Sequence, residues 1–349
     1  MATICIPSFL SLLIIFTNFI PHLANNTTLP VIFIFGDSTA DVGTNNYLNS
    51  SNATANFPHN GIDFPNSRPT GRFSNGFNSV DFLGKSTRSQ SRGVNFASGG
   101  SGILRETGSN LITQFTSVRD NFTAMIGPAA TEALLSKSLF FISVGSNDIF
   151  DYFSSKCKTP EEKFISNMIS VYCKHIKNLY RLGARKFGII NVPAVGCCPS
   201  QRLVQKQING TNGCYEAMND FALAFDLALD SLLRNISLKL PGIKYSLGNA
   251  HRMTLDVITN SEFFGKKLNV LLLFSCFSNV DSACCGTGTL NAQGRCNSTA
   301  YLCPNRPDYL FWDLFHPTQK ASNLSAQTLY NGPQYYVSPT NFAQLAKNN

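Results

Sequence analysis

The sequence of 349 residues predicts a three-layer α/β/α sandwich around a central, mainly five-stranded parallel sheet. Three observations support this fold class. Short apolar segments lack strict alternation with polar residues, which is typical of strands buried on both faces. Longer segments with apolar residues at helical spacing lie between them. Glycine-rich polar turns follow several of the apolar segments, where α/β proteins collect their functional groups.

The expected strands cover residues 31–35, 93–97, 139–144, 186–192 and 243–247. Two amphipathic helices are the clearest of those that alternate with them, at residues 160–182 and 214–240. Their apolar stripes are predicted to be core faces. No internal repeat or linker interrupts the pattern, so we expect one domain over residues 25–349.

The N-terminus is predicted to be a signal peptide of residues 1–24. The apolar run at residues 9–20 has the length of a signal-peptide core and is too short to span a bilayer. No Lys or Arg precedes it, and His22 is unusual so close to a cut after Ala24. Nine Asn-X-Ser/Thr sequons add weak support. We therefore expect a secreted, extracellular protein without stable membrane insertion.

Composition excludes several classes of protein. Charged residues make up 14% of the chain, well below the roughly 25% of an average domain, so a charge-rich disordered protein is excluded. The net charge is +8, but the basic residues are scattered and form no run with interleaved aromatics. Nucleic-acid binding is therefore not expected.

The cysteines indicate disulfides. Four of them lie inside one Gly/Asn/Ser-rich segment of twenty residues: Cys284, Cys285, Cys296 and Cys303. Their spacing does not match zinc ribbons or fingers and no His lies among them, so disulfides are favoured over a metal site. A second local group, with its pairing open, comprises Cys197, Cys198 and Cys214.

Polar motifs follow three of the expected strands. They are GDS at 36–38, SGG at 98–100 and GSND at 145–148. Each alone is typical of a turn or helix cap. Near the C-terminus Asp313 precedes His316 by three residues, which makes His316 the best candidate base. The other histidines lie in the signal peptide, in an expected helix, or outside a comparable motif: His22, His175, His59 and His251. Together these parts can form a serine acyl-transfer site.

The motifs resemble the plant GDSL esterase/lipase family of the SGNH hydrolase superfamily. The matching stretches run in the family's order: FGDS (35–38), DVG (41–43), NNY (45–47), GRFSNG (71–76), GVNFASG (93–99), GSND (145–148), LGARK (182–186), ACCG (283–286) and residues 311–318. The resemblance implies the flavodoxin-like SGNH hydrolase fold.

The resemblance also implies residue roles. Ser38 would be the nucleophile, His316 the base and Asp313 the acid that orients His316. The oxyanion hole would combine the Ser38 N–H, the Gly99 N–H and the Asn147 side chain. Three further residues are considered beside these.

Gly100 is an alternative to Gly99, because the register of this glycine pair is open. Two neighbouring carboxylates, Asp37 and Asp148, are expected to hold loops and not to move protons. Neither a cofactor nor a metal is expected.

Hydrolysis of carboxylic (acyl or acetyl) esters is the expected activity, on a small-molecule, lipid or polysaccharide ester. Two alternatives stay open. The same acyl-enzyme could pass its acyl group to a sugar or lipid hydroxyl. Alternatively, the chain could be a non-catalytic binding or structural protein built on the fold.

Two segments depart from the family pattern. The connection at residues 85–91 is short, and residues 266–276 are inserted with the apolar run VLLLF at 270–274. The insertion could be an aggregation liability or could cap an acyl-binding groove. Both departures could also record a gene-model difference.

We predict that Ser38→Ala abolishes turnover of a p-nitrophenyl ester, because no acyl-enzyme can form. Asn147→Ala should lower the rate by about a hundredfold or more, the usual effect of losing one oxyanion donor, without unfolding the protein. Rates of p-nitrophenolate release and circular-dichroism spectra check both variants. An unchanged rate in Ser38→Ala would contradict the assignment of the nucleophile.

Overall fold

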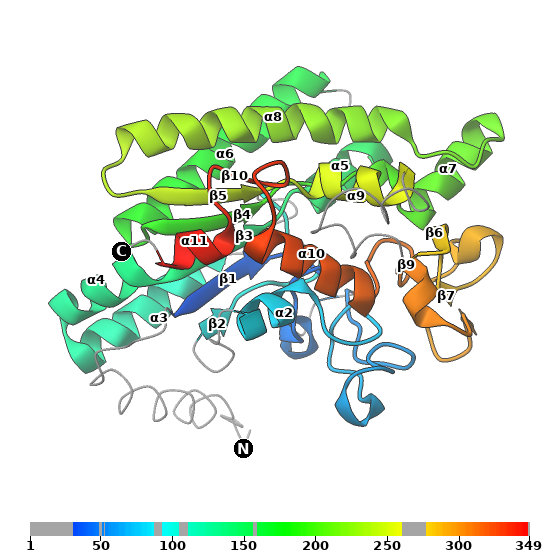
Figure 1. Ribbon diagram of the computed structural model, residues 1–349, viewed down its shortest axis with the longest axis horizontal. Helices are drawn as coiled ribbons and strands as arrows, with labels where there is room; N and C mark the ends of the chain where they lie inside the picture. The colour runs from blue at the N-terminus through cyan, green and yellow to red at the C-terminus, as the bar shows by residue number, and fades with distance from the viewer. Residues whose placement is uncertain are drawn as a thin grey trace, which may run out of the picture.

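A computed structural model describes residues 31–48, 51, 53–86, 93–104, 111–155, 159–259 and 277–347. These residues form a central sheet with helices on both faces, as the sequence predicts (Figure 1). The expected signal peptide, most of the short connection at 85–91 and the insertion at 266–276 lie outside the described residues.

The sheet has the strand order β10-β5-β4-β3-β1-β2. Its five parallel strands confirm the predicted segments: β1 (Ile32–Gly36), β2 (Gly93–Asn95), β3 (Leu139–Ser143), β4 (Lys186–Ile190) and β5 (Lys244–Gly248). The sixth strand, β10 (Val337–Ser338), pairs antiparallel with β5 at the edge. Two residues are too few to give a hydrophobic pattern, so this strand was not predictable from the sequence.

The strands are buried on both faces, which explains why their sequences do not alternate. Phe33 of β1 and Phe140 of β3 face one hydrophobic core, whereas Ile32 and Phe141 of the same strands face another. Successive side chains of a strand point to opposite faces, so a strand covered on both faces must be apolar throughout.

The larger core lies against the helices of one face. These are α3 (Leu111–Ile126), α4 (Pro128–Lys137), α5 (Ser146–Ser154), α6 (Glu161–Arg181) and α8 (Glu216–Lys239). Helices α6 and α8 are the two predicted from their apolar stripes. Each buries at least four side chains of its stripe, such as Met168 in α6 and Phe225 in α8.

The other face is covered by α10 and α11, which lie in front of the sheet in Figure 1, together with α2 and α9. Their bounds are α2 (Ser79–Ser86), α9 (Ala250–Thr259), α10 (Gln319–Asn331) and α11 (Phe342–Lys347). The α-helix α7 (Pro199–Asn209), in the described part of the chain, lies beyond the carboxyl end of β4 and contacts the C-terminal loops.

Disulfides replace a regular core in those loops, which confirms the interpretation of the cysteines. Cys284 is bonded to Cys303 and Cys285 to Cys296. Four short strands run through this region: β6 (Asn279–Ala283), β7 (Cys285–Gly286), β8 (Tyr301–Leu302) and β9 (Tyr309–Phe311). The cystines pack around the fully buried ring of Trp312.

The second cysteine group forms one bond, between Cys197 and Cys214. The thiol of Cys198 stays reduced and buried, and burial raises its pKa to about 11.

Among the described helices none combines the length and apolarity needed to cross a membrane.

We expect Phe140→Ala to lower the free energy of unfolding by about 3–5 kcal/mol, because it removes a fully buried ring and leaves a cavity. The Phe140 ring centroid lies between 5.1 and 6.4 Å from those of four other phenylalanines. Urea unfolding measures the change. Leu238→Ala is the control, because Leu238 is 87% exposed and its loss should change stability by less than about 0.5 kcal/mol.

Candidate active site

The carboxyl ends of β1 and β3 define the site. β1 lies between β2 and β3, so the chain leaves β1 to one side and crosses to its other side to form β3. A crevice opens where the chain reverses in this way in α/β sheets. Ser38 lies two residues beyond β1, and Asn147 lies in the first turn of α5, directly after β3.

Ser38, His316 and Asp313 form a continuous chain of hydrogen bonds. The Nε2 atom of His316 lies 2.6 Å from Ser38 Oγ. Its Nδ1 atom lies 2.8 Å from each carboxylate oxygen of Asp313. The tautomer with the proton on Nδ1 donates to Asp313 and leaves Nε2 free to accept the serine proton. This is the geometry of a serine nucleophile with an oriented base.

The loop that carries His316 is fixed by its own backbone. Asp313 Oδ1 accepts the N–H groups of Phe315 at 2.9 Å and His316 at 2.8 Å. The N–H of Trp312 donates to the His316 carbonyl at 2.7 Å, and the Trp312 indole donates to Asn60. Since Trp312 is fully buried, it anchors the loop to the protein. The phenyl ring of Phe73 packs on the imidazole, with the centroids 4.9 Å apart.

Charge pairing dominates the ionisation of the His316–Asp313 pair. Burial alone would lower the pKa of His316, but the charge and hydrogen bond of Asp313, with a smaller contribution from Asp37, raise it above its ordinary value. Burial would raise the pKa of Asp313, but His316 and two backbone N–H groups lower it. Asp313 is therefore ionised at neutral pH and can stabilise an imidazolium.

The two neighbouring carboxylates hold loops, as expected. Asp37 is buried, and its Oδ1 accepts the N–H of Thr39 at 2.9 Å and the hydroxyl of Thr39 at 2.7 Å. Burial raises the pKa of Asp37 despite these bonds. Asp148 accepts the N–H groups of Ile103 at 2.7 Å and Leu104 at 2.9 Å.

The candidate oxyanion donors differ in their availability. Asn147 Nδ2 donates one N–H to the Ser101 carbonyl at 2.8 Å, which fixes the side-chain amide. The second N–H of Nδ2 takes no part in this bond. The Gly99 N–H donates to Asp41 Oδ2 at 2.9 Å and so already has an acceptor. Gly100, the alternative, lines the cavity at Ser38.

A cavity of about 630 Å³ contains the site. Ser38, Asn147, Asp313 and His316 all line it. Much of its remaining wall is apolar and comes from α5, α9, α10, β9 and the ends of β3 and β4, including Val144, Phe150, Ile190, Val192, Met253, Val257, Phe311 and Leu324. Its volume is that of a small-molecule or acyl-chain site.

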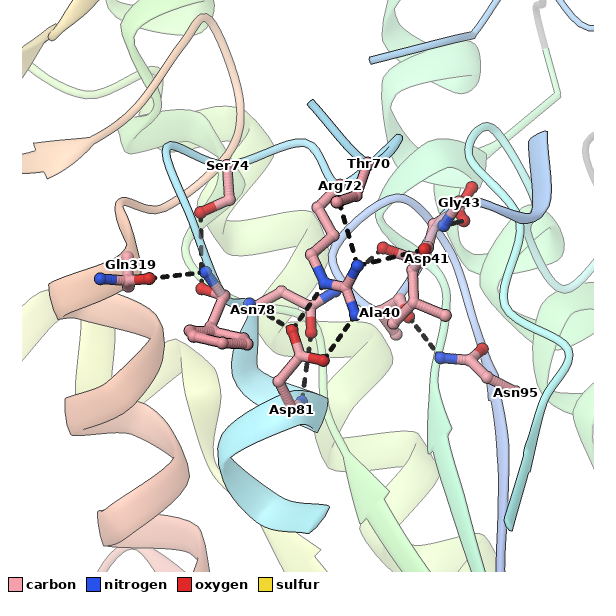
Figure 2. A network of polar contacts seen from close by, with 12 residues as sticks. Ala40, Asp41, Gly43, Thr70, Arg72, Ser74, Asn78, Asp81, Asn95 and Gln319 are labelled. Atoms are coloured by element: carbon pink, nitrogen blue, oxygen red, sulfur yellow. Dashed lines mark hydrogen bonds and ion pairs between the residues drawn. The ribbon is translucent and has the colours of Figure 1, made fainter. Parts of the chain in front are cut away.

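The loop after Ser38 is held by a polar network (Figure 2), of which Asp41 and Arg72 lie in the family motifs whereas Asn78 and Asp81 do not. Arg72 donates two bonds of 2.7 Å to Asp81 and one of 3.2 Å to the Val42 carbonyl. Asn78 donates to the Asp41 carbonyl at 2.9 Å. The feature of the sequence that could have predicted this network is the high frequency of Asp, Asn and Arg in these segments, which are too polar to form a hydrophobic core.

The other described histidines lie outside this arrangement. His175 Nε2 is 3.2 Å from the Ile103 carbonyl. His251 is buried, and its Nδ1 lies 3.8 Å from Asp226 Oδ2, a carboxylate 25 residues away in the sequence. Burial lowers the pKa of His251 and raises that of Asp226. The described residues contain no group of three His, Cys, Asp or Glu side chains that could hold a metal ion.

Known proteins resemble the chain over most of its length. The sequence profile described as GDSL-like Lipase/Acylhydrolase matches residues 32–329. GDSL esterase/lipase At5g55050 of Arabidopsis thaliana is 33% identical and aligns with 91% of this chain and 90% of its own. GDSL esterase/lipase LTL1 of the same plant is 33% identical, with 93% of both chains covered. GDSL esterase/lipase 6, also from Arabidopsis thaliana, is 32% identical over 93% of this chain and 92% of its own.

The raised pKa of His316 predicts the pH profile of ester hydrolysis. With neutral His316 as the expected base, kcat/KM should fall as the pH drops through a pKa above the ordinary 6.5. Asp313→Asn removes the charge that raises this pKa, so the acidic limb should move to lower pH and the plateau rate should fall by about 10³- to 10⁴-fold. Both effects are measured from profiles of kcat/KM against pH, over roughly four pH units from about pH 5 to about pH 9, which include the histidine pKa.

Asp120→Asn is the matched control for this profile, because the Asp120 side chain is 61% exposed on α3. It should leave both the limb and the plateau unchanged. An acidic limb that stays in place in Asp313→Asn would contradict the coupling of the two side chains.

Proposed function

The chain belongs to the GDSL-like lipase/acylhydrolase family and is an ester-bond hydrolase, and from this premise we propose that it is a secreted serine esterase acting through an acyl-enzyme on Ser38. The observation that carries the mechanism is the 2.6 Å contact between His316 Nε2 and Ser38 Oγ, with Asp313 behind the imidazole. It gives the hydroxyl a base within proton-transfer reach.

In the proposed acylation step, Ser38 Oγ attacks the ester carbonyl carbon while its proton passes to His316 Nε2. The electron pair of the carbonyl bond moves to the oxygen, where the Ser38 N–H and an Asn147 Nδ2–H stabilise the negative charge. When the tetrahedral intermediate collapses, the leaving oxygen takes the proton from His316. The alcohol departs, and the acyl group stays on Ser38.

Deacylation reverses the roles with water as the nucleophile. His316 takes a proton from the water, which attacks the acyl carbon, and returns that proton to Ser38 Oγ as the carboxylic acid leaves. Asp313 stays ionised throughout and compensates the charge of the imidazolium. The lowered pKa of Asp313 supports this role.

The apolar wall of the cavity supports an ester with a hydrocarbon acyl group. Burying each additional methylene contributes about 0.8 kcal/mol, or about a fourfold gain in kcat/KM, as long as space remains. Acetyl esters need none of this wall, so the dependence of the rate on chain length reveals whether the wall is used.

Secretion to the apoplast or cell wall is part of the same proposal. The apolar run at residues 9–20 and the three described disulfides support it, because disulfides persist in oxidising compartments. The alternative acyltransferase uses an identical acyl-enzyme and differs only in the acceptor of the acyl group.

We expect a fluorophosphonate probe to label the purified protein at Ser38 and to leave Ser38→Ala unlabelled. Across p-nitrophenyl esters from acetate upward, kcat/KM should rise by up to about fourfold per methylene until the cavity is full. Labelling is read by gel fluorescence and by mass spectrometry of the modified peptide. A folded protein that fails to label would favour the non-catalytic binding or structural alternative.

An added arm separates hydrolysis from transfer. The protein is incubated with an acyl donor and with glycerol or glucose as the acceptor, and the ratio of acylated acceptor to free acid is measured. A ratio below one at an acceptor concentration on the order of 0.1 M supports hydrolysis, whereas dominant transfer supports the acyltransferase.

A further inference from the structure

The turn Ser98–Gly99–Gly100 lies at the carboxyl end of the sheet beside the nucleophile. The N–H of Ser98 donates to the Gly36 carbonyl at 3.0 Å, which ties the turn to the end of β1. The N–H of Ser101 donates back to the Ser98 carbonyl at 3.0 Å and closes the turn. The orientation of the intervening peptide groups therefore decides which N–H faces the cavity.

Two side chains from the loop after Ser38 hold both polar groups of Gly99. Its N–H donates to Asp41 Oδ2 at 2.9 Å, and its carbonyl accepts Asn45 Nδ2 at 2.8 Å. The hydroxyl of Ser98 donates to Asn45 Oδ1 at 2.5 Å. We call Asp41 and Asn45 together the Gly99 clamp.

The Gly99 clamp is buried and anchored. Asp41 is fully buried, and its other oxygen accepts the N–H groups of Gly43 and Thr44 at 2.7 Å each. Figure 2 shows Asp41 between Gly43 and the Arg72–Asp81 network. Asn45 is also buried and donates to the Ala53 carbonyl at 2.7 Å. If Asp41 turned away it would leave N–H groups unpaired, and if Asn45 turned away it would leave carbonyl groups and the Ser98 hydroxyl unpaired, at a cost of about 1–3 kcal/mol for each buried group.

Gly99 is poorly placed to stabilise an oxyanion. Its N–H already donates to the Asp41 carboxylate. An oxyanion that accepted a hydrogen bond from the same N–H would lie close to this carboxylate. Like charges at short range in a buried site repel strongly. A side chain at this position is excluded as well, because a Cβ on Gly99 would lie 2.9 Å from the Phe73 ring that packs on His316.

Gly100 has the opposite properties. It lines the cavity, is exposed, and has a φ of +85°, a conformation that favours glycine. Among the described residues, no hydrogen bond of its N–H to a backbone or side-chain acceptor is found. This N–H is the next donor along the chain from the one that Asp41 holds.

We propose that Asp41 and Asn45 are positioning residues that fix the Ser98–Gly99 turn, so that the N–H of Gly100, and not that of Gly99, is the third donor to the oxyanion. The inference rests on the proposed function, since the oxyanion forms only if Ser38 attacks an ester. It assigns a role to two motif residues, three and seven positions after the nucleophile, that touch no reacting atom.

The donor is identified in the full-length protein labelled with [¹⁵N]glycine. A trifluoromethyl ketone adds to Ser38 and gives an adduct with an oxyanion. We expect the Gly100 amide proton to move downfield in the adduct and the Gly99 proton, already bonded to a carboxylate, to stay in place. Movement of the Gly99 proton with a static Gly100 proton would overturn the proposal.

The clamp is tested with Asp41→Asn, which keeps the shape but points an amide donor or a weaker acceptor at the Gly99 N–H. The Gly99 resonance should move upfield, and kcat should fall by about tenfold or more with KM changed less than about threefold, since the loss of a whole donor costs about 10²–10³. Rates are divided by the concentration of sites titrated with fluorophosphonate. A merely structural role would lower the number of sites and leave kcat per site unchanged.

Asp63→Asn is the matched control, because Asp63 is another hydrogen-bonded carboxylate, held by the Asn75 and Arg306 side chains, and lies outside the clamp. Its kcat per site should equal that of the wild type. If Asp41→Asn does not fold, Asn45→Asp tests the same clamp from the carbonyl side of Gly99, with the same expected fall in kcat. Wild-type kcat in the folded variant would overturn the proposal.

Failure of the proposed function gives a different result. In that case the wild type neither labels with fluorophosphonate nor forms the ketone adduct. The Gly99 resonance of the unliganded protein still tests the clamp, because a resonance unmoved by Asp41→Asn would overturn it whether or not esters are hydrolysed.

Discussion

The hydrogen bond between Ser38 Oγ and His316 Nε2 joins two segments that are 278 residues apart, and most of the described structure serves to hold its two ends. Ser38 is fixed by β1, which lies inside the sheet between β2 and β3. His316 is fixed by Asp313 and by the buried ring of Trp312, in a loop stabilised by disulfides. Both ends must be rigid, because proton transfer requires contact within about 2.6–3.2 Å.

Buried carboxylates supply much of this rigidity. Asp41 accepts the N–H of Gly99 and Asp148 accepts those of Ile103 and Leu104, all from loops far away in the sequence. Asp81 binds Arg72 with two bonds. These loops lack the regular backbone hydrogen bonds of a helix or sheet, so side-chain oxygens accept the hydrogen bonds of their backbone N–H groups. In a chain with only 20 acidic residues, several of them are used inside the protein around one site. The chain thus has few charged residues, and several of its carboxylates lie where they hold the loops around the site.

The site combines this polar frame with an apolar cavity. The frame fixes the proposed oxyanion donors, base and nucleophile, while the wall built by α9, α10 and β9 offers surface to a hydrocarbon group. An ester has both a polar reacting centre and apolar substituents, so the two parts of the cavity match the two parts of the substrate class. Selectivity among esters then depends on the wall and not on the reacting groups.

The strands, the two long helices, the family motifs and the presence of disulfides could be predicted from the sequence, because apolar periodicity and motif spacing are local properties. Tertiary structure decided what depends on contacts between distant segments. It added β10 beside β5, paired Cys197 with Cys214, and brought Asp226 close to His251. It also gave the Gly99 N–H to Asp41, 58 residues earlier in the chain. A glycine pair has no side chain to record which amide is free, so only the packing of the neighbouring loop distinguishes Gly99 from Gly100.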